Sequence, residues 1–70
     1  MTDNSYKILN YLKEHGATSA KEIADALGIE KRRVDSYFSA AIANKQLGER
    51  DTSVTPSLLK LNDAGMAYTQ

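Results

Sequence analysis

The chain has 70 residues, of which nine are basic and nine acidic, so its formal net charge at pH 7 is zero. A chain of this length forms one small domain with a limited core, and we expect residues 1–70 to be that single domain. It has no cysteine and one histidine, which excludes disulfide bonds and thiolate metal sites and argues against an all-protein zinc site.

Several function classes lack the sequence features that they need. No apolar run approaches the roughly 20 residues of a membrane span, and the opening MTDNSYK lacks the basic start and apolar stretch of a signal peptide. There is no glycine-rich phosphate loop and no nucleophile with a base at motif spacing. We therefore expect a soluble cytoplasmic protein that is not an enzyme and that needs no cofactor and no metal.

The first predicted element is a helix over roughly 5–15. Residues Asp3, Asn4 and Ser5 are all favourable N-cap types, and Gly16 is a typical helix end. Between them, the apolar residues that share one helical face are Ile8, Leu9 and Leu12.

Residues 20–39 read as two short helices joined by a tight turn. Ser19 and Glu22 fit a capping box, so the first of these helices begins near 20 and stops at Leu27. Its apolar or small face consists of Ala20, Ile23, Ala24 and Leu27. Gly28 follows, where a residue without Cβ enters the left-handed conformation cheaply and lets the chain reverse.

The next predicted helix, helix 3, runs from about 31 to 45. Glu30 falls at its N-cap position, and three consecutive basic residues occupy its start: Lys31, Arg32 and Arg33. Its apolar stripe consists of Val34, Tyr37, Phe38, Ala41 and Ile42. Two helices at this spacing pack at a steep angle, as in a helix-turn-helix.

Beyond Lys45 the pattern changes to two short strands, over 47–51 and 57–61, with the polar loop TSVTP between them. We call residues 47–61 the wing. The predicted core consists of Ile8, Leu9, Leu12, Ile23, Ala24, Leu27, Val34, Phe38, Ala41, Leu47, Leu59 and Leu61.

The order of these motifs resembles the winged helix-turn-helix of MarR-like and ArsR-like transcriptional regulators over about residues 5–68. Ala24, Gly28 and Val34 stand at the offsets of their turn, and Leu61, Asn62, Asp63 and Gly65 match the entry to their last helix. The resemblance implies a mainly α (α+β) fold, with three helices, a two-stranded β-wing and the short helical turn. The long dimerisation helices and sensor cysteines of those families are missing.

The resemblance also implies sequence-dependent binding of double-stranded DNA as a small transcriptional regulator. Helix 3 would enter the major groove and the wing would lie on the flanking backbone. The candidate DNA-binding residues are Lys31, Arg32, Arg33, Ser36, Ser39, Arg50 and Lys60. A tight complex would need a second copy of the chain on an adjacent half-site.

One feature of helix 3 opposes DNA binding and supports a different function. Asp35 places a carboxylate on the groove-facing side, where it repels phosphate unless it accepts from a cytosine amino group or pairs with Arg32 or Ser39, and we expect the pairing. This carboxylate and the zero net charge fit the alternative, a winged-helix module that binds a protein and not DNA.

Overall fold

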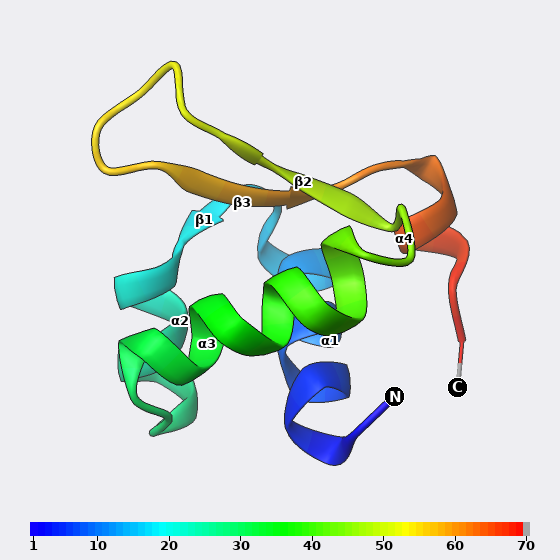
Figure 1. The fold of residues 1–70 in the computed structure, drawn as a ribbon, viewed down its shortest axis with the longest axis horizontal. Helices are drawn as coiled ribbons and strands as arrows, with labels where there is room; N and C mark the ends of the chain where they lie inside the picture. The colour runs from blue at the N-terminus through cyan, green and yellow to red at the C-terminus, as the bar shows by residue number, and fades with distance from the viewer. Residues whose placement is uncertain (70) are drawn as a thin grey trace.

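In the computed structural model, which describes residues 1–69, three helices lie beneath a small antiparallel sheet and a short C-terminal helix lies beside one end of it (Figure 1). In chain order the elements are α1 (Asp3–His15), β1 (Thr18–Ser19), α2 (Ala20–Leu27), α3 (Lys31–Tyr37), the π-helical segment η1 (Phe38–Ala43), β2 (Gly48–Asp51), β3 (Leu58–Leu61) and α4 (Asp63–Ala67). This confirms the mainly α fold with a β-wing.

Helix α1 begins two residues earlier than predicted, because its N-cap is Thr2. The Thr2 hydroxyl accepts a hydrogen bond from the backbone N–H of Ser5 at 3.3 Å and lies 2.9 Å from the Ser5 hydroxyl. Ser5 is therefore a buried residue of the first turn and not a cap. Several cap-type residues in a row compete for this role, and the sequence alone does not rank them.

The first helix of the helix-turn-helix and its turn are as predicted. Helix α2 covers 20–27, and the Ser19 hydroxyl accepts from the backbone N–H of Glu22 at 3.2 Å. Gly28 has φ +68° and ψ +32°, the left-handed conformation that reverses the chain. Glu30 is the N-cap of α3, as expected, but its carboxylate does not cap the helix.

Helix 3 was expected to be α-helical from 31 to 45, and this is wrong in its second half. The chain winds into the wider π form over η1, and residues 44–46 form a turn. The wider turn leaves Ile42 fully buried with Phe38, while Ala41 is only half-buried. The departure is at the far end from the basic residues, so the start of α3 keeps α-helical spacing.

The sheet has three strands and not the expected two. Strand order is β1-β3-β2, both pairs are antiparallel, and Thr18 and Ser19 pair with Leu59 and Leu58. A two-residue strand has no room for an alternating pattern, and Ser19 was already explained as a helix cap, so the sequence did not reveal β1. The extra pairing fastens the loop end of β3 to the start of α2 (Figure 1).

The core lies between the sheet and the three long helical segments. Nine of its residues were predicted, namely Ile8, Leu9, Leu12, Ile23, Ala24, Val34, Phe38, Leu47 and Leu59, and Ala20 and Ile42 complete it. Leu27, Ala41 and Leu61 were also placed in the core, but they are half-buried at its edge. They stand at the ends of elements or in the π turn, where one flank of the side chain faces solvent.

The C-terminal segment closes the fold on the side away from the wing loop (Figure 1). The Asn62 side chain caps α4 by accepting from the backbone N–H of Gly65 at 2.8 Å, as the motif predicted. Lys13 of α1 donates to the backbone carbonyl of Tyr68. The second contact holds Tyr68 against α1, and the first residues of α3 stay exposed.

Candidate nucleic-acid interface

Three rows of side chains run along the part of α3 that the core does not cover. Residues four positions apart share a row in an α-helix, which places Lys31 with Asp35, Arg32 with Ser36, and Arg33 with Tyr37. Lys31, Arg32, Arg33, Ser36 and Ser39 are all exposed, as the sequence predicted for a binding face. The contacts of each row show which of its side chains remain available to a binding partner.

The first row faces the wing through Asp35. One carboxylate oxygen accepts from the Lys31 ammonium at 3.1 Å, and the other accepts from the Arg50 guanidinium of β2, also at 3.1 Å. The expectation that Asp35 pairs with Arg32 or Ser39 is therefore wrong. Asp35 lies on the flank of α3 that faces the wing, so β2 supplies the second cation that sequence spacing could not reveal.

The middle row points directly away from the core. The Arg32 side chain is 84% exposed, and its Nε donates to the carboxylate of Glu30 at 2.9 Å. So exposed an ion pair contributes little to stability, and its partner can be exchanged for another anion. The Arg32 guanidinium is thus open to a ligand, with Ser36 on the next turn.

The third row faces α1. The Tyr37 hydroxyl accepts from the Asn4 side chain at 3.3 Å, and this hydrogen bond lowers the pKa of Tyr37 against the opposing effect of burial. A hydrogen bond from Arg33 and its positive charge lower that pKa further. Tyr37 is half-buried and packs against the core, which agrees with the predicted stripe. Arg33 therefore lies at the α1 edge of the face.

The two candidate residues of the wing point to opposite faces of the sheet. Arg50 pairs in register with the buried Leu59, so it shares the face that looks toward α3. Lys60 pairs with Glu49 on the outer face, where their charged groups lie 3.7 Å apart. The structure brings Arg50 together with Lys31 and leaves Lys60 apart from them.

Two hydrogen bonds form a turn at the start of the wing loop. The backbone N–H and the hydroxyl of Ser53 both donate to the Asp51 carboxylate, the first at 2.9 Å. The hydroxyl and then the N–H lower the pKa of Asp51 below its ordinary value. The Asp51 carboxylate is therefore charged, and it already accepts hydrogen bonds from Ser53. It stands next to Arg50 in the chain.

A comparison with known families matches residues 1–44 to a family described as winged helix-turn-helix DNA-binding. The chain belongs to this family. The match spans α1, the helix-turn-helix and α3 with η1, and the wing follows it. No curated protein and no solved structure matches significantly.

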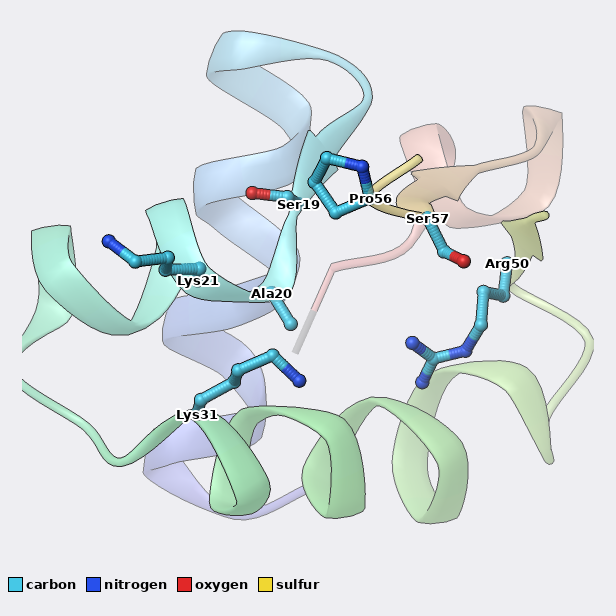
Figure 2. Close-up of a pocket in the computed structure, with 7 residues that line it drawn as sticks. All are labelled: Ser19, Ala20, Lys21, Lys31, Arg50, Pro56 and Ser57. Carbon is cyan, nitrogen blue, oxygen red and sulfur yellow. The ribbon is translucent and has the colours of Figure 1, made fainter. Parts of the chain in front are cut away.

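In this member of the winged helix-turn-helix family, a hollow opens where α2, α3 and the wing meet (Figure 2). Lys31 and Arg50 line it together with Ser19, Lys21 and Ser57, and its volume is about 140 Å³. The sequence assigned no binding role to the last three residues. Their convergence depends on β1, which holds the loop end of β3 beside the start of α2 and which the pattern of polarity did not reveal.

Two other findings concern the part of the chain that the structure describes. Among residues 1–69, no helix is long and apolar enough to cross a membrane. Over the same range, no group of three or more histidine or acidic side chains is placed to hold a metal ion.

Proposed function

We propose that this winged helix-turn-helix protein binds double-stranded DNA as a small transcriptional regulator. The start of α3 enters the major groove, and the wing lies along the flanking backbone. The observation that carries the proposal is the exposed basic start of α3 in a family of DNA-binding domains. In a helix-turn-helix, this end of the recognition helix approaches the bases.

Each row of α3 has a role in this proposal. Arg32, in the outermost row, reads a base, since a guanidinium can donate two hydrogen bonds to the edge of guanine. Ser36 and Ser39 donate to bases or phosphates near it. Lys31 and Arg33 flank Arg32 and contact phosphates on either side of the groove, which positions the helix without reading sequence.

The wing contributes Arg50 on the face toward α3, near the loop, and Lys60 on its outer face. Arg50 contacts the backbone beside the groove that α3 enters, because it lies next to Lys31. Lys60 reaches a more distant part of the backbone, since it points away from α3. A single copy makes few contacts, so tight binding uses two copies on half-sites about one helical turn apart.

A titration of duplex DNA against salt tests the proposal. With roughly two to four phosphates neutralised, log affinity falls against log salt with a slope of about −2 to −4. Arg32→Gln relaxes base preference, whereas Lys31→Gln lowers affinity evenly across sequences and flattens the slope by about one. Lys7→Gln, which removes the same charge from an exposed position on α1, is the control and leaves the slope unchanged.

The second candidate function is a protein-binding module that does not bind DNA. The observation that favours it is the pairing of Lys31, Arg32 and Arg50 with carboxylates, which reduces the positive field at the start of α3. The same titration decides between the two functions. A protein-binding module gives no salt-dependent DNA binding even at low ionic strength.

A further inference from the structure

The hollow between α2, α3 and the wing has the polar groups of an anion site. In Figure 2 the side chains of Lys31 and Arg50 reach toward each other from α3 and β2, and the Ser57 hydroxyl points toward Arg50. Asp35 accepts one hydrogen bond from each of the two cations. An ammonium has three N–H donors and a guanidinium five, so donors remain for a ligand.

The hollow is also lined by Ser19, the N-cap of α2, and by Lys21 within that helix. The Ser19 hydroxyl accepts from the N–H of Glu22 and points away from Lys31 and Arg50 in Figure 2. The ammonium of Lys21 points away from the hollow in Figure 2 and contacts Asp25 at 3.3 Å. That pair is exposed on both sides and therefore weak, so the flexible side chain can turn toward an anion.

The charge of the site identifies the kind of anion. Lys21, Lys31 and Arg50 carry three positive charges, and their partners Asp25 and Asp35 cancel two, which leaves a single positive charge beside the hollow. A phosphodiester carries one negative charge, whereas a phosphate monoester carries about −1.5 to −2 at pH 7. A volume of about 140 Å³ exceeds that of several water molecules and accommodates one tetrahedral phosphate group.

We propose that this hollow binds a single phosphodiester group of the DNA backbone. Lys31, Arg50 and the Ser57 hydroxyl hold it, and Lys21 closes over it. The assignment rests on the proposed function, and it adds Ser57 and Lys21 to the interface. It also fixes the wing relative to the recognition helix, since both contact the same phosphate.

The test compares DNA affinity over a range of salt concentrations for Lys21→Gln, Ser57→Ala and the control Lys7→Gln. Lys21→Gln is expected to flatten the salt slope by about one, while Lys7→Gln leaves it unchanged. Ser57→Ala, which changes no charge, is expected to lower affinity about threefold to tenfold at every salt concentration. Thermal unfolding of each variant shows that the fold is kept.

A second arm separates the DNA backbone from free phosphate as the source of the group. Chloride is replaced by inorganic phosphate at constant ionic strength, and DNA affinity is measured again. The proposal predicts no change in affinity for the unmodified chain. A fall in affinity that disappears in Ser57→Ala would assign the hollow to free phosphate and overturn the backbone assignment.

The outcomes separate a failure of the phosphate site from a failure of the proposed function. If Lys21→Gln and Lys7→Gln have equal slopes and Ser57→Ala binds normally, while Arg32→Gln still relaxes base preference, the phosphate site is wrong and DNA binding by α3 stands. If the unmodified chain does not bind duplex DNA at low salt, both proposals are wrong.

Discussion

The carboxylate of Asp35 accepts a hydrogen bond from the Arg50 guanidinium at 3.1 Å, which joins α3 to the wing across the binding face. Its other oxygen accepts from Lys31 at the same distance. Asp35 therefore orients two cations of the candidate interface and also cancels one of their charges. The three groups together keep one positive charge.

Asp35→Asn should raise affinity for any duplex, because it removes the carboxylate that repels phosphate while keeping an oxygen that can accept a hydrogen bond. The gain is about fivefold, from roughly 1 kcal/mol for one charge near water. Fluorescence anisotropy at several salt concentrations measures it. Asp63→Asn, an equal change on α4, is the control, and equal affinities for the two variants would contradict the role of Asp35.

The elements of this fold could be predicted because their signals are local. Capping pairs such as Ser19 with Glu22, the turn at Gly28 and the cap at Asn62 each involve residues a few positions apart. Apolar spacing likewise located most of the core. The boundary at Thr2 was missed because adjacent residues were equally good caps.

The parts that could not be predicted depend on contacts between distant segments. Strand β1 exists because Thr18 and Ser19 meet β3 some 40 positions later, at Leu59 and Leu58. The partner of Asp35 on the wing, Arg50, depends on that docking as well. The cations of the interface could be predicted from the sequence. Their ion pairs and the hollow between them could be identified only from the tertiary structure.

Phe38→Ala should be severely destabilising. Phe38 is fully buried where α3 passes into η1, and truncating a core aromatic costs about 3–5 kcal/mol, a large share of the stability of a small domain. Chemical denaturation measures the change. Ser39→Ala, at an exposed position next to it, should stay within about 0.5 kcal/mol. An unchanged unfolding midpoint for Phe38→Ala would contradict the helix register.

Gly65→Ala should destabilise the contact between α4 and the rest of the fold. Gly65 is buried, and a Cβ there would overlap the backbone carbonyl of Leu47. Overpacking of this kind costs about 1–3 kcal/mol. Thermal unfolding would show the loss, while Met66→Ala at the exposed neighbouring position should change little. Equal stability of the two variants would mean that α4 docks differently.

The loop of the wing, residues 52–56, should move more in the free protein than the strands beside it. Its residues are all exposed, and Val54 at its tip packs against none of the core. NMR relaxation measures the motion, and order parameters below those of β2 and β3 are expected. Order equal to that of α2 in the free protein would contradict a loop that becomes ordered only on its partner.

The most direct test of DNA binding through α3 is an NMR titration of the chain with duplex DNA at low ionic strength. Backbone amide shifts should change over residues 31–39 and 50–60, with Arg32 and Ser36 among the most affected, and the changes should weaken as salt is added. Shifts that avoid both segments at low salt would contradict the account, and the protein-binding function would then take its place.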